Sequence, residues 1–223
     1  MTTNKAVFLS VALAGFLVSC GDESSEIIDV PIDGARYKAT LSAEWSTATH
    51  PDMFPNNPHF SPLIGATHAA TDLLWREGGT ATNGVEVMAE TGGTTALESE
   101  VAQAVQSGSA GAVVTGSGIN PSPGSATATF VVTPEHPLLT LVTMIAPSPD
   151  WFIGVNGLKL LDDQGQWRER VEVDLFAYDA GTDNGDTYAA ADIDTSPKGM
   201  ITKLQGGDFG VRFGTLVLER QPE

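Results

Sequence analysis

The sequence contains one cysteine, Cys20, in 223 residues, so no intrachain disulfide can form. Basic residues are also scarce: 11 Lys and Arg stand against 28 Asp and Glu and give a formal net charge of −17. Nucleic acids and anionic lipid headgroups attract clustered positive charge. We therefore expect no nucleic-acid partner and no unaided docking on anionic membranes, whereas the acidic composition favours solubility and cation binding.

The sequence also lacks the motifs of the common enzyme classes. It has no Gly-x-Ser-x-Gly nucleophile elbow, no His-Glu-x-x-His zinc motif, no phosphate-binding glycine loop and no dinucleotide fingerprint. Internal repeats are absent as well. These absences predict a protein that is not an enzyme.

Residues 1–19 are predicted to be an export signal. Lys5 supplies the positive charge that precedes an apolar stretch at residues 6–18, which is too short to span a bilayer. The stretch ends in Leu-Val-Ser-Cys, which resembles the bacterial lipoprotein signal, where the cysteine is lipidated after cleavage. We expect Cys20 to carry the lipid and residues 20–35 to be a polar tether. The protein is then exported and anchored in the bacterial envelope, at the outer membrane on its periplasmic or surface face.

Alternating side chains predict antiparallel strands in the rest of the chain. At residues 37–45 every second residue is apolar, the pattern of a strand with one buried face and one wet face. A chain of this length suits one all-β domain, so we expect an antiparallel β-sandwich over residues 36–223 with long loops and one or two short helices. Further strands are expected at residues 127–133, 138–144 and 209–218, a helix at 96–106, an irregular proline-rich segment at 50–68 and an exposed loop at 107–125.

The central part of the chain predicts three consecutive strands. Residues 144–146 end an incoming strand, residues 152–160 form a returning strand, and residues 167–178 form a third. If these strands form an up-down-up meander, the first and the third run in the same direction. Asp150 then follows the first strand and Asp179 follows the third, so both carboxylates lie at one end of the sheet.

Acidic side chains crowd this predicted sheet end. Asp183 follows Asp179 in the same loop, and Asp186 lies just beyond it. Like charges raise each other's pKa unless a cation or hydrogen-bond donors compensate, and calcium accepts about six to eight oxygen ligands in a flexible geometry. Loop aspartates are also common turn formers. The residues by themselves leave a calcium site and a set of acidic turns both open.

Two blocks of sequence occur in a fixed order. The first contains Trp-Ser at residues 45–46, His-Phe-Ser-Pro at 59–62 and Gly-Ala-Thr-His at 65–68. The second begins Pro-Ser-Pro-Asp-Trp-Phe-Ile-Gly-Val at residues 147–155 and ends Tyr-Asp-Ala-Gly-Thr-Asp-Asn-Gly at residues 178–185. Together these blocks resemble the spondin N-terminal domain, the domain of F-spondin and mindin, from about residue 37 to about residue 204.

This resemblance implies an antiparallel β-sandwich related to calcium-dependent membrane-binding domains, with a calcium site in its end loops. It also implies extracellular adhesion or recognition rather than catalysis. By the resemblance, Asp150, Asp179 and Asp183 match the calcium-binding aspartates of the family. The family can carry a further acidic ligand on the strand before His136, but residues 127–133 contain no carboxylate.

We therefore predict a calcium-binding recognition or adhesion module whose ligand is an extracellular protein or a glycan. One alternative is a metal-dependent hydrolase, because His50, His59 and His68 are evenly spaced and three His could ligate zinc. Zinc motifs usually use shorter spacings, which favours imidazoles that hydrogen-bond backbone groups. The other alternative is a purely structural envelope protein.

Overall fold

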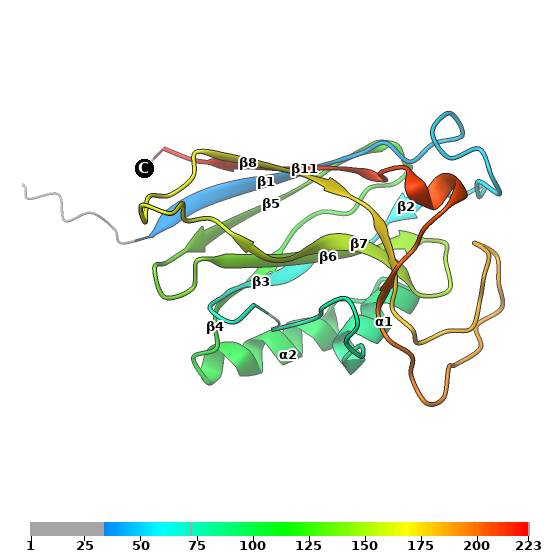
Figure 1. Ribbon diagram of the computed structural model, residues 1–223, viewed down its shortest axis with the longest axis horizontal. Coiled ribbons are helices and arrows are strands. Elements are labelled where there is room, and N and C mark those ends of the chain that lie inside the picture. Colours follow the sequence, from blue (N-terminus) through cyan, green and yellow to red (C-terminus); the bar gives the residue numbers. More distant parts are fainter. Residues whose placement is uncertain (1–33, 72, 223) are drawn as a thin grey trace, which may run out of the picture. The chain divides into compact units, whose positions relative to one another are not determined.

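The computed structural model describes residues 34–71 and 73–222, whose strands form two antiparallel sheets (Figure 1). Cys20, the predicted export signal and the predicted tether up to residue 33 lie outside the described residues. The first strand begins at Ala35, the last residue of the predicted tether. Among the described helices, none has the length and apolar character that crossing a bilayer requires.

The first sheet has four strands in the order β5-β1-β11-β8. Its strands are β1 (Ala35–Ala43), β5 (Gly124–Val132), β8 (Arg170–Leu175) and β11 (Gly214–Arg220). The alternation that predicted the first strand is confirmed, because in β1 the residues of one face are buried and most of the others are exposed. This face of β1 lies against the second sheet and contributes to the core between the sheets.

The second sheet runs in the order β10-β9-β7-β6-β3-β4, and β2 also pairs with β6. Its strands are β2 (His59–Phe60), β3 (Ile64–His68), β4 (Ala110–Thr115), β6 (Leu138–Ala146), β7 (Trp151–Lys159), β9 (Ala177–Asp179) and β10 (Thr202–Lys203). All nine residues of β6 are buried. Such a strand is covered on both faces, which explains why its sequence is apolar without alternation.

Two helices, α1 (Asn83–Thr91) and α2 (Thr95–Gln106), cover the outer face of the second sheet (Figure 1). A second core lies there, to which the helices contribute Val85, Met88 and Leu97 and the sheet contributes Ile64 and Phe152. The predicted sandwich with one or two short helices is therefore confirmed. The helix expected at residues 96–106 corresponds to α2.

Gly65 permits the close approach of β3 to β6 in the second sheet. A Cβ atom at this position would lie 1.9 Å from the carbonyl oxygen of Thr140. Only glycine leaves room for two backbones at this separation. Close packing of β3 on β6 therefore explains why the Gly-Ala-Thr-His block begins with glycine.

The third strand predicted for the central stretch is wrong as one continuous element. Residues 167–178 divide at Phe176: β8 pairs with β11 in the first sheet, and β9 pairs with β7 in the second. The alternating pattern continues across both pieces, so sequence periodicity does not reveal the change of sheet. The direction of the chain is unaffected, because β6 and β9 both run antiparallel to β7.

Two segments expected to be irregular contain strands. The exposed loop predicted at residues 107–125 includes β4, which pairs with β3. The proline-rich segment at 50–68 includes β2 and β3, because its last proline, Pro62, precedes β3 and leaves that strand free to pair. Composition rich in Gly, Ser and Pro indicates loops on average, but tertiary pairing decides where a strand forms.

Candidate metal centre

Asp150 and Asp179 lie at the same end of the second sheet, as the strand directions require. Asp150 is the residue before β7, and Asp179 is the last residue of β9. Trp151 and Asp179 are direct partners in the pairing of these two strands, and the backbone N–H of Ala180 donates to the carbonyl oxygen of Asp150 at 3.2 Å. The sheet therefore fixes the two aspartates beside each other.

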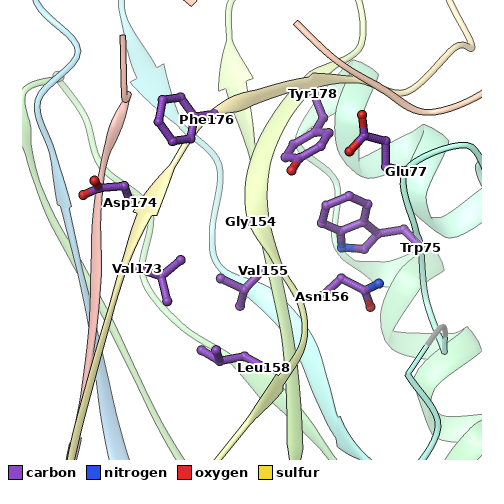
Figure 2. A pocket seen from close by; sticks show the side chains of 10 residues that line it. All are labelled: Trp75, Glu77, Gly154, Val155, Asn156, Leu158, Val173, Asp174, Phe176 and Tyr178. Carbon is purple, nitrogen blue, oxygen red and sulfur yellow. The ribbon is translucent and has the colours of Figure 1, made fainter. Parts of the chain in front are cut away.

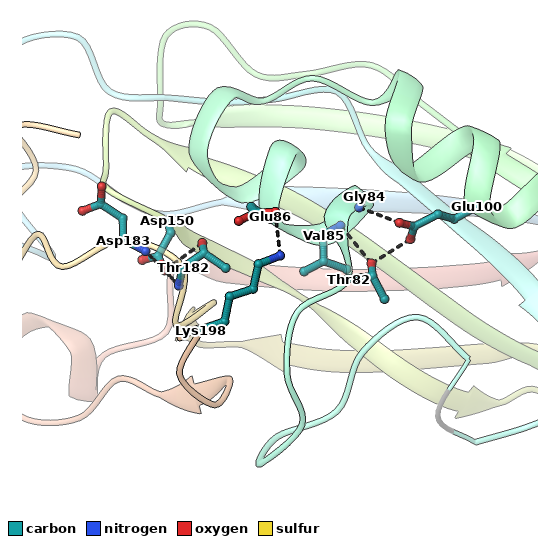
Figure 3. A network of polar contacts seen from close by, with 9 residues as sticks. All are labelled: Thr82, Gly84, Val85, Glu86, Glu100, Asp150, Thr182, Asp183 and Lys198. Atoms are coloured by element: carbon teal, nitrogen blue, oxygen red, sulfur yellow. Dashed lines mark hydrogen bonds and ion pairs between the residues drawn. The ribbon is translucent and has the colours of Figure 1, made fainter. Parts of the chain in front are cut away.

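The Asp150 side chain is fully buried, and its two oxygens have different surroundings. Oδ2 accepts hydrogen bonds from the backbone N–H groups of Thr182 and Asp183, at 2.7 and 3.1 Å, and from the Thr182 hydroxyl at 3.2 Å (Figure 3). Oδ1 is also buried, yet no hydrogen-bond partner for it is found in the described part of the chain. A buried carboxylate oxygen without a partner is costly unless a donor, a proton or a cation satisfies it.

Asp179 and Asp183 shape the loop that follows β9. Asp179 Oδ1 accepts the N–H of Gly181 at 2.8 Å, in a turn where Gly181 has φ +73°. Asp183 is 6% exposed, and its two oxygens accept the N–H groups of Gly185 and Ile193, both at 2.6 Å. These carboxylates organise the loop, and both oxygens of Asp183 are directed at backbone N–H groups of that loop.

Burial is the main cause of raised pKa values for Asp150 and Asp179 at this end. Burial raises the pKa of Asp150, and hydrogen bonds from Thr182 and Asp183 partly oppose this effect. Burial, followed by the charge of Asp150, raises the pKa of Asp179 to about 6. Lys198 and Arg212 form their ion pairs with other carboxylates, those of Glu86, Glu44 and Asp174. The site thus holds negative charge that a bound cation or protons would stabilise.

Glu90 is a further acidic residue of this region that the sequence did not indicate. It lies in the last turn of α1, and its Oε1 atom is buried and lacks a hydrogen-bond partner among residues 34–71 and 73–222. Burial raises its pKa, contact with Thr182 lowers it, and the charge of Asp150 adds to the rise. Thr182 therefore lies between the two carboxylates.

A helical pattern in the sequence could have pointed to Glu90. Val85, Met88 and Ala89 are spaced as on one face of a helix, and Thr82 stands at the N-cap, where its hydroxyl accepts the Val85 N–H at 3.2 Å. That Glu90 lies near Asp150, however, depends on how α1 packs on the second sheet. Sequence spacing carries no information about that packing.

A salt bridge joins the loop after β9 to α1. Lys198 Nζ lies 2.6 Å from Glu86 Oε2, with both side chains partly exposed (Figure 3). The loop is therefore held at both ends: Asp150 binds its first residues, and Glu86 binds Lys198 near its last. Surface ion pairs contribute little stability by themselves, so we assign this one an orienting role.

The residues fit a hard cation in part. The donor type is right, because buried carboxylates are the ligands calcium prefers, and Asp150 Oδ1 is without a partner. Yet no group of three or more His, Cys, Asp or Glu side chains in the described residues is arranged as a metal site. Asp150 and Asp179 are the pair that the sheet fixes in place. Asp183 could join them as a ligand only with an oxygen lone pair that is not used by its hydrogen bonds to the Gly185 and Ile193 N–H groups.

The three histidines considered for zinc are not brought together. His50 is buried with its ring 4.4 Å from that of Phe213, and His68 is buried with Nε2 2.8 Å from the hydroxyl of Thr140. His59 contacts the carbonyl oxygen of Asn57 at 2.8 Å. Each imidazole thus has separate local partners, and burial lowers the pKa of His50 and His68.

Residues 35–208 match the family model described as Spondin_N. The chain is 34% identical over 174 residues to Spondin-2 of Rattus norvegicus and to Spondin-2 of Homo sapiens, and each alignment covers 76% of this chain. It is also 34% identical over 181 residues, 78% of this chain, to Spondin-1 of Gallus gallus. The aligned regions make up 52% of the Spondin-2 relatives and 22% of the Spondin-1 relative, so this chain corresponds to about half of a Spondin-2.

Proposed function

Because this chain belongs to the spondin N-terminal domain family, whose members are non-enzymatic extracellular modules, we propose that it is a calcium-binding recognition or adhesion module. The observation that carries the calcium part is the fully buried carboxylate of Asp150, whose Oδ1 has no partner in the described residues while Asp179 and Asp183 lie beside it. Recognition by an extracellular protein or glycan is the role we expect from the family.

Asp150, Asp179 and Asp183 are the residues that would hold the ion. Calcium supplies charge neutralisation at a cluster of carboxylates and ordering of the loops that carry them. The chain itself fixes Asp150 and Asp179 through the pairing of β7 with β9. It places Thr182 and Asp183 on the other oxygen of Asp150, which leaves Oδ1 as the oxygen available for a ligand.

Calcium titration of four proteins tests this proposal. We expect Asp150→Asn and Asp179→Asn each to weaken calcium binding strongly, because each keeps the side-chain shape and removes one charge. Asp186→Asn is the matched control, since Asp186 is exposed in the same loop and should bind like the parent. Calorimetry measures the affinity. Parent-like binding by both Asp150→Asn and Asp179→Asn would show that these aspartates only form turns.

Thermal melting gives a second, independent measurement. A ligand that binds only the folded state stabilises by about 2.7 kcal/mol at a hundredfold excess over its dissociation constant. Chelation should lower the melting temperature of the parent, and added calcium should restore it. Magnesium should restore it poorly, because it requires small octahedral geometry and loses water reluctantly. A melt that is unchanged across the calcium titration contradicts a calcium site.

We propose from the sequence that Cys20 attaches the module to the bacterial envelope. The support is the short apolar stretch that ends in Leu-Val-Ser-Cys; diacylation of the cysteine exceeds the single chain that gives only marginal membrane binding. Mass spectrometry of the protein from its native membrane should find lipid on Cys20 and no trace of residues 1–19. Cys20→Ser should accumulate as the uncut precursor, and retention of residues 1–19 in the parent contradicts the proposal.

A further inference from the structure

A pocket of about 330 Å³ lies where the two sheets separate (Figure 2), and Asp150, Asp179 and Asp183 are not among the residues that line it. The chain changes sheets at Phe176, so β9 pairs with β7 only as far as Ile153. Beyond that point β8 belongs to the other sheet. Gly154, Val155, Asn156 and Leu158 of β7 therefore line a gap that β9 does not fill. Figure 2 shows β8 on one side of this gap and Trp75 on the other.

Trp75 lines this pocket and carries a hydrogen-bond donor without a partner in the described residues. Its side chain is 6% exposed, and within the described residues its Nε1 has no hydrogen-bond partner. Figure 2 shows the nitrogen-bearing edge of the indole facing Asn156 of β7. Buried Trp N–H groups usually find an acceptor, and a ligand whose oxygen reaches this edge of the indole would supply one.

Acceptors and aromatic surface surround that donor. Glu77 and Asp174 are exposed carboxylates on opposite sides of the pocket, and the Asp174 carboxylate also contacts Arg212 at 3.0 Å. The Tyr178 ring lies 4.9 Å from the Trp75 ring. Burial, together with the charge of Glu77, raises the pKa of Tyr178, so its phenol stays protonated and can donate.

These features exclude several ligand classes. The carboxylates of Glu77 and Asp174 repel an anion. An ammonium or guanidinium group has no acceptor, and an apolar group has none either, so both would leave the Trp75 N–H unsatisfied. A neutral sugar ring provides hydroxyl oxygens for Trp75, hydroxyl protons for Glu77, and carbon-bound faces for the aromatic rings.

The pocket also favours a compact ligand over an extended peptide. A peptide added to the edge of β7 would need several consecutive unpaired residues. Ile153 is already paired with Ala177. At Gly157 a Cβ atom would lie 3.0 Å from the carbonyl oxygen of Thr71, so that residue packs against the strand. Only residues 154–156 remain open, which is short for strand addition.

We propose that this pocket, bounded by Trp75, Glu77, Asn156, Asp174 and Tyr178, binds a neutral sugar residue. The proposal gives a ligand class to the recognition role proposed above, on which it rests, and it makes no use of the acidic loops. It also gives a reason for the change of sheet at Phe176, because a continuous third strand would close the gap.

The indole N–H resonance of Trp75 is the direct readout. The sequence contains 4 Trp, so a ¹⁵N-labelled full chain gives few indole signals, and Trp75→Phe identifies the one that matters. The probes are the methyl pyranosides of glucose, galactose, mannose and N-acetylglucosamine at millimolar concentration. We expect at least one of them to shift the Trp75 signal saturably and to leave the Trp167 signal in place.

A variant that keeps the fold tests the acceptor. Glu77→Gln removes an exposed charge and should weaken binding of the active pyranoside by about threefold to tenfold, the value of one hydrogen bond. Glu172→Gln, on β8 outside the pocket lining, should bind like the parent. Equal binding by Glu77→Gln and the parent overturns the assignment of this pocket, and so does a Trp75 signal that no pyranoside shifts.

Two further measurements separate the proposals. If N-acetylarginine amide shifts the Trp75 signal and no sugar does, the pocket takes a cationic side chain of a protein partner and the sugar proposal is wrong. Sugar binding should persist when calcium is chelated, and its loss would place the sugar at the acidic loops instead. Sugar binding in a chain that fails to bind calcium leaves this proposal intact and overturns only the calcium site.

Discussion

At the scale of single residues, Asp179 links the acidic site to pH. Its pKa is about 6 in the folded protein against an ordinary value of 3.8. A group whose pKa is raised by folding contributes stability that is fully present below the unfolded value and is lost as the pH rises through the folded value. The calcium-free protein therefore loses stability between about pH 4 and about pH 6 because of Asp179.

Asp179→Asn should reverse that loss. The amide oxygen can still accept the Gly181 N–H, but the side chain no longer ionises. Without calcium, the variant should be more stable than the parent by about 1–3 kcal/mol at neutral pH, with the difference vanishing near pH 4. Chemical denaturation across this pH range measures it. A difference between Asp179→Asn and the parent that stays constant across this pH range would contradict the expected charge burial.

At the scale of elements, α1 depends on its N-terminal cap. The Thr82 hydroxyl accepts the Val85 N–H at 3.2 Å and donates to Glu100 Oε2 of α2 at 2.7 Å (Figure 3). Glu100 Oε1 accepts the Gly84 N–H at 2.7 Å. Thr82 therefore both begins α1 and joins it to α2.

Thr82→Ala should destabilise the protein by about 1–2 kcal/mol, which for a domain of this size lowers the melting temperature by about 2–8 °C. Thr94→Ala is the matched control. Thr94 stands at the N-cap of α2 but makes no side-chain cap hydrogen bond. Thr94→Ala should therefore destabilise the protein less than Thr82→Ala does. Equal effects in thermal melts would show that the contact with Glu100 and the cap at Thr82 contribute nothing specific.

At the scale of the whole molecule, Trp45 connects the two sheets with the acidic loop. Its side chain is fully buried, and its ring packs against Phe60 of β2 at 5.6 Å, Phe213 at 5.8 Å and Tyr188 of the loop after β9 at 5.3 Å. These rings belong to segments far apart in the sequence. The core at this end is therefore continuous with the loops that carry Asp150 and Asp183.

Trp45→Ala should cost about 3–5 kcal/mol, because it removes a large buried ring and leaves a cavity. That is a large part of the stability of an ordinary domain, so the melting temperature should fall steeply, and calcium should recover only part of the loss. Trp167→Ala is the control, since Trp167 is only partly buried against the same core. If Trp45→Ala lowers the melting temperature no more than Trp167→Ala does, the central role of Trp45 is contradicted.

The sequence by itself determined the features that are local or periodic. Alternation identified β1, apolar runs between prolines identified β5 and β6, helical spacing identified α2, and strand direction placed Asp150 and Asp179 at one sheet end. These inferences hold because side-chain period and chain direction are properties of the strand itself. The family resemblance reached further, because it implied the β-sandwich that the two sheets form.

Only the tertiary structure decided which sheet each strand joins and what lies across from it. The alternation of residues 167–178 is the same on either side of Phe176, so the passage from β8 to β9 and the pocket beside it were invisible in the pattern. Glu90 reaches Thr182 only because α1 packs on the second sheet. Burial, the raised pKa of Asp179 and the unpartnered oxygen of Asp150 likewise arise from groups distant in the chain, whose proximity no local pattern encodes.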